Sequence, residues 1–220
     1  PLLIGSAGTC GTDKTVDWFL EITKELAKEL NQNIKITLLK CSQSKKNINK
    51  AFLNKNLSPL NNAPKISSKK IINCTNIVGL AGVEQITEAI NTKADIIICG
   101  RSTDASLIAS LPIMKGVDEA IAWHAGKIGE CGAFCTTNPR SGVILISFQK
   151  NGFFIKPVSN NTKVTPYTVS AHMVYENSNP FTLIEPGGCL DVKKALYKKQ
   201  KDGSVYVTGA NWVQDPNYKI

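Results

Sequence analysis

Residues 91 to 106, Asn-Thr-Lys-Ala-Asp-Ile-Ile-Ile-Cys-Gly-Arg-Ser-Thr-Asp-Ala-Ser, decide the fold class of this chain. Ala94 to Cys99 contains three consecutive isoleucines, which is typical of a short strand buried on both faces. Gly100 ends this strand, and residues 102–104 are all favourable helix N-caps before a predicted helix from Ala105 to Leu111. A strand, a tight loop and a helix in this order form the corner where open α/β sheets bind ligands.

Arg101 lies in this corner, and only two of the 26 basic residues of the chain are arginine. A guanidinium where lysine is the usual choice suggests that its planar fork is needed, for a carboxylate or a phosphate. The alternative is an exposed loop charge or a structural pair with Asp104. Gly100, Arg101 and Asp104 are therefore candidate anion-binding residues.

A second candidate ligand loop, residues 5–15, reads Gly-Ser-Ala-Gly-Thr-Cys-Gly-Thr-Asp-Lys-Thr and precedes an amphipathic helix predicted from Lys14 to Leu30. Its glycine spacing matches neither the dinucleotide fingerprint nor the P-loop. Small residues, free backbone N–H groups and a helix N-terminus still favour an anion there. The alternative is that Thr12 or Asp13 only caps the helix. The candidate binding residues are Gly5, Ser6, Gly8, Thr9, Gly11 and Thr12.

Strand and helix patterns alternate along residues 1–140, which is typical of βαβ units and a parallel sheet. We expect strands at 1–4, 33–40 and 94–99, a strand or extended segment at Ile71 to Val78, and helices at 14–30, 83–91, 105–111 and 117–128. The pattern changes near residue 140 to hairpins, with predicted strands at 143–148, 153–158, 190–192, 194–197 and 204–208 and a helix from Pro166 to Tyr175. The predicted fold is α/β, a partly parallel Rossmann-like sheet with helices on both faces in residues 1–140, followed by a smaller α+β portion in residues 141–220.

Composition excludes several classes of protein. The chain has 220 residues, 42% of them hydrophobic, and no run approaches the eighteen apolar residues of a membrane span. Seven scattered cysteines without a secretory signal argue against a disulfide framework and for a reducing compartment. The net charge of +9 is mostly dispersed lysine without interleaved aromatic or arginine residues, so we expect no nucleic-acid partner. The same charge favours acidic metabolites.

The candidate catalytic residues are His124, Glu130 and Cys131. A histidine near an acidic residue can transfer protons near neutral pH, and a cysteine near a base can act as a nucleophile. The alternatives are a histidine packed beside Trp123 and an inert buried cysteine. His172, four residues before Glu176 on a predicted helix, could form a metal pair with it, but a packed or surface histidine is the favoured interpretation. We expect no metal site, since the cysteine spacing lacks the paired pattern of zinc sites.

Five ordered segments together resemble one family, the acyclic terpene utilisation (AtuA-like) proteins. They are Ile4-Gly-Ser-Ala-Gly-Thr-Cys-Gly-Thr, Ile98-Cys-Gly-Arg-Ser-Thr-Asp-Ala-Ser, Ala122-Trp-His-Ala-Gly-Lys-Ile-Gly-Glu-Cys-Gly-Ala, Val169-Ser-Ala-His-Met-Val-Tyr-Glu-Asn-Ser-Asn-Pro-Phe and Glu185-Pro-Gly-Gly-Cys-Leu-Asp-Val. Members are usually about twice this length, so the chain is expected to be an internal portion that lacks the first strand and helix of its α/β domain and is truncated at its end.

The resemblance implies a cytoplasmic α/β protein, tied in some members to the breakdown of acyclic terpenoids such as citronellol and geraniol. It names no cofactor. It also suggests members encoded beside a small companion protein, and a homo-oligomer is expected. Two functions remain open. One is an enzyme of small carboxylic acid or acyl-CoA catabolism, of the lyase, hydratase or isomerase type, acting on a small anionic metabolite. The other is a non-catalytic ligand-binding subunit or scaffold that works with the companion.

Overall fold

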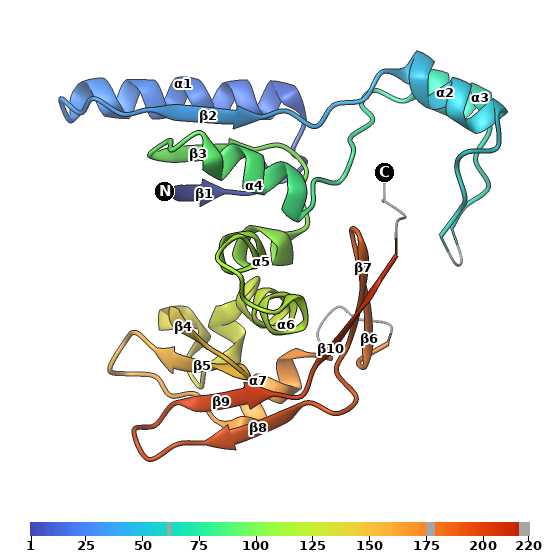
Figure 1. The fold of residues 1–220 in the computed structure, drawn as a ribbon. Coiled ribbons are helices and arrows are strands. Elements are labelled where there is room, and N and C mark those ends of the chain that lie inside the picture. The colour runs from blue at the N-terminus through green and yellow to red at the C-terminus, as the bar shows by residue number, and fades with distance from the viewer. Residues whose placement is uncertain (61–62, 175–178, 216–220) are drawn as a thin grey trace. The chain divides into compact units, whose positions relative to one another are not determined.

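The computed structural model describes residues 1–60, 63–174 and 179–215 (Figure 1). The chain folds into two compact units. Unit 1 comprises Pro1–Leu80 and Asp95–Ser102, and unit 2 comprises Ala81–Ala94 and the described residues between Thr103 and Asp215. The chain therefore passes between the units three times before residue 104. The boundary expected near residue 140 separates two sequence patterns rather than two compact bodies, and it stays a prediction.

Unit 1 is built on a three-stranded parallel sheet of β1 (Leu2–Ile4), β2 (Ile36–Leu39) and β3 (Ile96–Cys99). The strand order is β1-β3-β2, so the strand predicted from Ala94 to Cys99 lies between the other two. Leu3 and Thr37 both pair with Ile97, which is fully buried. The prediction of a parallel sheet in an α/β chain is thus confirmed. A Rossmann-like sheet is not, because in the common doubly wound orders the third strand does not separate the first two.

Helix α1 (Asp13–Glu29) packs on this sheet through Val16, which lies in one buried cluster with Ala7 and Ile98. Its first turn is fixed by Thr12, whose hydroxyl accepts a hydrogen bond from the Thr15 N–H. Thr12 is thus the N-cap that the sequence allowed, and it sets the point where the loop after β1 becomes helical.

One predicted element of unit 1 is wrong. The segment Ile71 to Val78 was expected to be a strand or extended, but its first residues belong to helix α3 (Ser68–Asn73), next to α2 (Lys45–Leu53). The Ser67 hydroxyl caps α3 and Ile71 is 1% exposed, so capping and burial outweigh the strand preference of paired isoleucines. Val78 does form a single antiparallel bridge to Ser42.

Unit 2 holds two antiparallel sheets and most of the helices. The four-stranded sheet has the order β4-β5-β9-β8 and the three-stranded sheet the order β10-β7-β6. The helices are α4 (Val83–Asn91), α5 (Asp104–Met114), α6 (Glu119–Gly129) and α7 (Pro166–His172), with 3-10 turns at Gly132–Cys135 and Pro139–Ser141. The strands are β4 (Ile144–Gln149), β5 (Gly152–Pro157), β6 (Thr182–Glu185), β7 (Gly188–Asp191), β8 (Leu196–Lys199), β9 (Val205–Thr208) and β10 (Asn211–Gln214).

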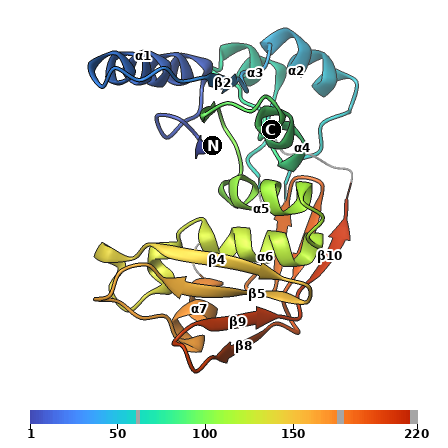
Figure 2. The ribbon, with the colours of Figure 1, turned by 60° about the vertical axis from the view of Figure 1, so that its left-hand side comes forward.

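Helix α6 lies over the four-stranded sheet and packs beside α5 (Figure 2). Its buried face carries Trp123, Ala125 and Ile128, which pack with Phe153 and Val205 of the sheet. Gly126 allows close contact with α5, because a Cβ there would lie 3.1 Å from the Ala105 carbonyl carbon. This packing fixes the positions of His124 and Glu130. Tyr175 of the expected α7 helix lies outside the described residues.

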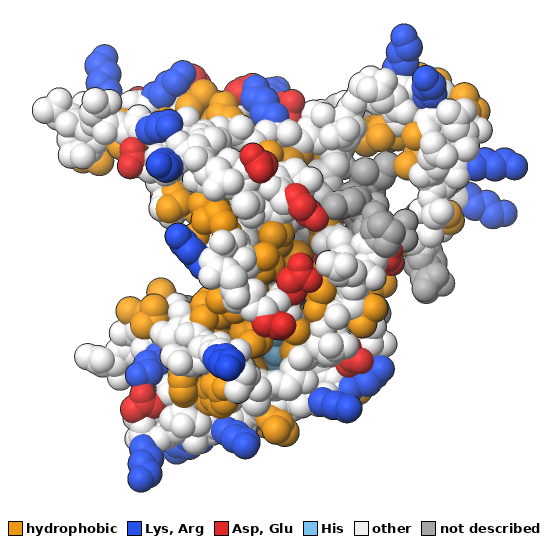
Figure 3. Space-filling view, in the orientation of Figure 1, with side chains coloured by type: hydrophobic (Ala, Val, Ile, Leu, Met, Phe, Trp, Pro, Cys, Tyr) orange, Lys and Arg blue, Asp and Glu red, His pale blue; other side chains and the backbone are white. Residues whose placement is uncertain are grey.

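The surface drawn in Figure 3 carries lysine and arginine side chains spread over several elements, as the sequence predicts for a dispersed positive charge. Among the described residues, no helix combines the length and the apolar character that crossing a membrane requires.

Candidate functional site

The carboxyl ends of β1, β2 and β3 lie at the same edge of the parallel sheet, and the residues that follow them form what we call the sheet rim, residues 5–12, 41–43 and 100–102. The first and last of these loops are joined by backbone hydrogen bonds. The Ser6 N–H donates to the Gly100 carbonyl at 3.2 Å, and the Arg101 N–H donates to the Gly11 carbonyl at 2.8 Å. The two predicted ligand loops of unit 1 therefore lie side by side.

The loop after β1 has an unusual backbone. Ser6, Gly8, Thr9 and Gly11 all have positive φ angles, of 43°, 65°, 68° and 63°. Five non-glycine residues among those described have positive φ, and three of them directly follow the C-caps of helices, where this conformation is common: Asn31, Lys55 and Lys93. Ser6 and Thr9 have no such explanation, and strained residues of this kind cluster at functional sites.

This conformation leaves donors available at the sheet rim. Among the residues that the structure describes, the Gly8 and Thr9 N–H groups donate no hydrogen bond. The half-buried Arg101 side chain donates from Nη1 to the Thr9 carbonyl at 3.4 Å and forms no ion pair with a described residue. Backbone N–H groups and a guanidinium carried by neighbouring loops are donors of the kind that bind anions.

Ser102 adds a polar group beside Arg101. The residue is 1% exposed, and its Oγ has no hydrogen-bond partner among the described residues. Its backbone N–H lies 3.5 Å from the Ser6 hydroxyl, and that hydroxyl donates to the Ser102 carbonyl. A buried hydroxyl without a partner costs about 1–3 kcal/mol and calls for an explanation such as a ligand or a bound water.

The N-terminus of α1 has a mainly structural role. The Asp13 carboxylate accepts hydrogen bonds from the Cys41 and Ser42 N–H groups at 3.1 and 3.0 Å, and the Asp13 N–H donates to the Ser42 hydroxyl. These bonds tie the loop after β1 to the loop after β2. With Thr12 as the cap, anion binding at the sheet rim rests on the loop backbone and Arg101 rather than on the helix end.

Cys10 carries an exposed thiol that the sequence analysis did not identify as a candidate. Its thiol is exposed and lies 3.8 Å from the hydroxyls of both Thr12 and Thr15. The Thr12 N–H, followed by those two hydroxyls, lowers the pKa of this thiol. The signal in the sequence was a cysteine two residues before a helix N-cap, a position that favours the thiolate.

His124 lies on α6 in unit 2. It is 0% exposed, its Nε2 lies 3.1 Å from the Tyr197 Oη, and its ring meets the edge of Phe153. Burial lowers the pKa of His124 to about 3, so the ring is neutral at physiological pH. This is the packed histidine that the sequence reading gave as the alternative, although beside Tyr197 and Phe153. Its catalytic role stays an untested prediction.

Glu130 is held by a partly buried ion pair. The Lys127 ammonium donates to Glu130, and the two side chains are 14% and 15% exposed. His172 belongs to the same group, because burial first and the Lys127 charge second lower its pKa. Cys131 is partly exposed, while burial raises the pKa of the neighbouring Cys135 thiol to about 12. Glu176 lies outside the described residues.

The structure thus groups the predicted residues into two sets. Gly5, Ser6, Gly8, Thr9, Gly11, Thr12, Gly100 and Arg101 belong to the sheet rim of unit 1. His124, Glu130 and Cys131 belong to unit 2, as does Asp104, the exposed first residue of α5 after the N-cap Thr103. Within the described residues, no three His, Cys, Asp or Glu side chains could hold one metal ion.

Comparison with known proteins agrees with the resemblance. The model of one family, described as "Acyclic terpene utilisation family protein AtuA", matches residues 3–219. Neither the curated proteins nor the solved structures gave a match. A match over nearly the whole chain covers the sheet rim of unit 1 and the α6 segment of unit 2. The chain therefore belongs to the acyclic terpene utilisation family AtuA.

Proposed function

We propose that the sheet rim binds the anionic end of a small organic acid or acyl-CoA, and that the chain acts as an enzyme of the lyase, hydratase or isomerase type in acyclic terpenoid breakdown. The family supports a role in acyclic terpene utilisation. The reaction type and the substrate are our inference. This inference rests on what such a reaction requires: a site that holds the carboxylate or phosphate of the substrate in place, and a nearby side chain that transfers a proton.

One observation carries the anion site. Arg101 has no acidic partner among the described residues. It is bonded to a loop in which the Gly8 and Thr9 N–H groups donate no hydrogen bond to a described residue. An arginine that served only to stabilise the fold would be expected to pair with a carboxylate. Here its one recorded bond, to the Thr9 carbonyl, ties the guanidinium to the loop that carries the Gly8 and Thr9 N–H groups. Cys10, whose thiol has a lowered pKa, is a group of the same loop that could move a proton or attack a substrate.

Arg101→Lys is expected to weaken the binding of citronellate, the carboxylate of an acyclic terpenoid, by about tenfold or more, because a point charge loses one of the two bonds of a bidentate fork. Isothermal titration calorimetry measures the dissociation constant. The matched control is Arg140→Lys, since Arg140 is the other arginine and lies exposed in the 3-10 turn at Pro139–Ser141 of unit 2. Equal affinities for the two variants and the native chain would remove Arg101 from the site.

The alternative function is a non-catalytic ligand-binding subunit that works with a small companion protein. The candidate catalytic residues of unit 2 give some support to this alternative, since His124 is neutral and buried and Glu130 is already paired with Lys127. Turnover of an acyclic terpenoid carboxylate or its CoA thioester by the isolated chain would rule the scaffold out. Binding without turnover, with activity only after the companion is added, would support it.

A further inference from the structure

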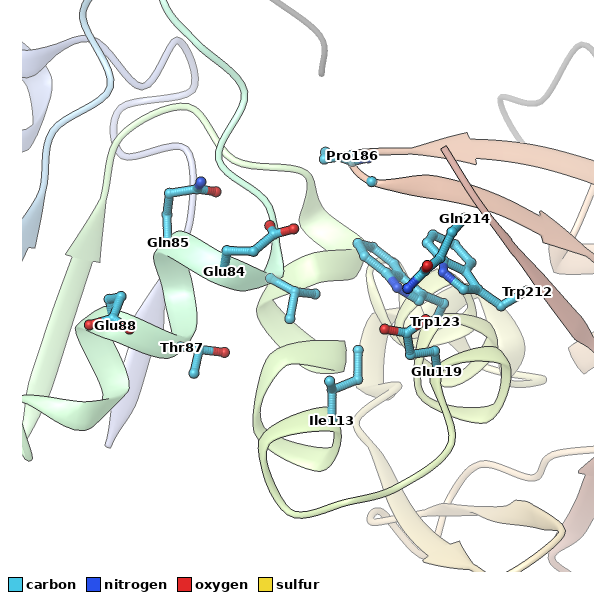
Figure 4. A pocket seen from close by; sticks show the side chains of 12 residues that line it. Glu84, Gln85, Thr87, Glu88, Ile113, Glu119, Trp123, Pro186, Trp212 and Gln214 are labelled. Atoms are coloured by element: carbon cyan, nitrogen blue, oxygen red, sulfur yellow. The ribbon is translucent and has the colours of Figure 1, made fainter. Parts of the chain in front are cut away.

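Unit 2 contains a cavity of about 520 Å³ that the proposed function does not use (Figure 4). It lies among α4, α5, α6, the turn between β6 and β7, and β10. Its twelve lining residues are Val83, Glu84, Gln85, Thr87, Glu88, Ile113, Glu119, Trp123, Pro186, Gly187, Trp212 and Gln214. All of them belong to unit 2, so the cavity is formed within one compact body.

The charge of this cavity has one sign. Three of the lining residues are glutamates, Glu84, Glu88 and Glu119, and none is lysine, arginine or histidine. This contrasts with a chain that carries 26 basic and 17 acidic residues. Carboxylates in a partly enclosed space attract cations and repel anions. The cavity is therefore unsuited to the acid that we propose for the sheet rim.

The aromatic wall is the second feature. The rings of Trp123 and Trp212 stack with centroids 5.0 Å apart and an angle of 7° between their planes. Trp123 is 2% exposed, whereas Trp212 is only partly buried and therefore offers more accessible surface to the cavity. In Figure 4 Glu84 extends from α4 towards this pair, and Glu119 lies beside it on α6. A tryptophan face next to carboxylates is the arrangement that recognises organic ammonium groups.

A metal ion fits the cavity less well. A metal requires several ligand atoms to converge on one point at about 2–2.6 Å, and no three acidic, histidine or cysteine side chains among the described residues could do so. The glutamates are thus spread around the cavity, together with the apolar side chains of Val83, Ile113 and Pro186. This spacing suits an extended molecule with an apolar body and a positive end.

We propose that the cavity of unit 2 is a binding site for an organic ammonium cation with an apolar or aromatic body, with Trp212 contacting the cation and Glu119 supplying the opposite charge. The site is separate from the sheet rim, and its ligand is either a second substrate or an effector. Its existence does not depend on the function proposed for Arg101.

The test uses phenethylamine, which is a cation at neutral pH, and 3-phenylpropionate, an anion with a similar skeleton. Tryptophan fluorescence is measured in a Trp18→Phe background, because Trp18 is the third tryptophan and lies 58% exposed on α1. Phenethylamine is expected to give a saturable change with a dissociation constant of about 1 mM or lower, and 3-phenylpropionate none. Glu119→Gln is expected to weaken the response by about tenfold, whereas Glu21→Gln on α1 leaves it unchanged.

Three results would overturn the proposal. One is an equal response to the anion, which would mean a non-specific apolar pocket. The second is a failure of the expected phenethylamine response, either because Glu119→Gln leaves that response unchanged or because phenethylamine causes no change in fluorescence. The third is competition by millimolar MgCl₂ at constant ionic strength, which would assign the carboxylates to a metal ion. A citronellate titration of the Glu119→Gln variant, expected to match the native chain, separates this site from the sheet rim.

Discussion

Replacing Lys127 with methionine is expected to lower the free energy of unfolding by about 3–5 kcal/mol, because it removes the ammonium that pairs with the largely buried carboxylate of Glu130. The two side chains are only 14% and 15% exposed, so water replaces the lost ammonium poorly. The positive charge that lowers the pKa of His172 disappears at the same time, and that pKa is expected to rise. Urea denaturation followed by circular dichroism gives the free energy.

The matched control is Lys24→Met. Lys24 also pairs with a glutamate three residues away, Glu21, but those side chains are 56% and 70% exposed. An exposed pair of this kind contributes only about 0–1 kcal/mol. A double variant, Lys127→Met with Glu130→Leu, should recover much of the loss, since it removes the buried charge as well. If Lys127→Met and Lys24→Met destabilise the chain equally, the ion pair of α6 is not buried in solution.

Gly11→Ala is expected to destabilise the chain by roughly 3 kcal/mol or more and to abolish citronellate binding, because it forces the two loops of the sheet rim apart. Gly11 has a φ of 63°, and a Cβ there would lie 2.5 Å from the Arg101 Cα and 2.7 Å from the Gly100 carbonyl carbon. Thermal unfolding and calorimetric titration together measure both effects.

Gly203→Ala is the control for backbone strain alone. Gly203 has a φ of 83°, but a Cβ there would have no neighbour within 4 Å. Its cost is therefore that of the left-handed conformation, about 1 kcal/mol, with citronellate binding unchanged. A Gly11→Ala variant that behaves like Gly203→Ala would show that the loops of the sheet rim do not need their close approach.

The sequence predicts most of unit 1 and the helices of unit 2. Three consecutive isoleucines identify β3, and the spacing of Val16, Phe19 and Leu20 identifies α1, because burial and periodicity are local signals. The helix α3 is missed, since the Ser67 cap and the burial of Ile71 act against the preference of the residues themselves. The strands β6 and β10 also go unrecognised. Each is only four residues long, which leaves little pattern to recognise. The strand β10 pairs with the distant β7, and β6 forms a hairpin with β7 across the turn at residues 186–187.

The candidate site is only partly predictable. The two loops of the sheet rim can be placed together because parallel strands end at one edge, and hydrogen bonds of Ser6 and Arg101 join them. The pairing of Glu130 with Lys127 is predictable, because residues three positions apart on a helix are neighbours, but the sequence analysis did not identify it. The cavity of unit 2 could not be foreseen, since Glu84, Trp123 and Trp212 come from three distant segments.

The most direct test of the sheet rim is an NMR titration of the ¹⁵N-labelled chain with citronellate, observing backbone amides and arginine Nε–H groups. Saturable shifts are predicted for the amides of Gly8 and Thr9 and for the Nε–H of Arg101, while Arg140 and the indole N–H of Trp212 stay unchanged. Shifts confined to residues of unit 2, or none at concentrations that saturate calorimetry, would contradict the assignment of the anion site to the sheet rim.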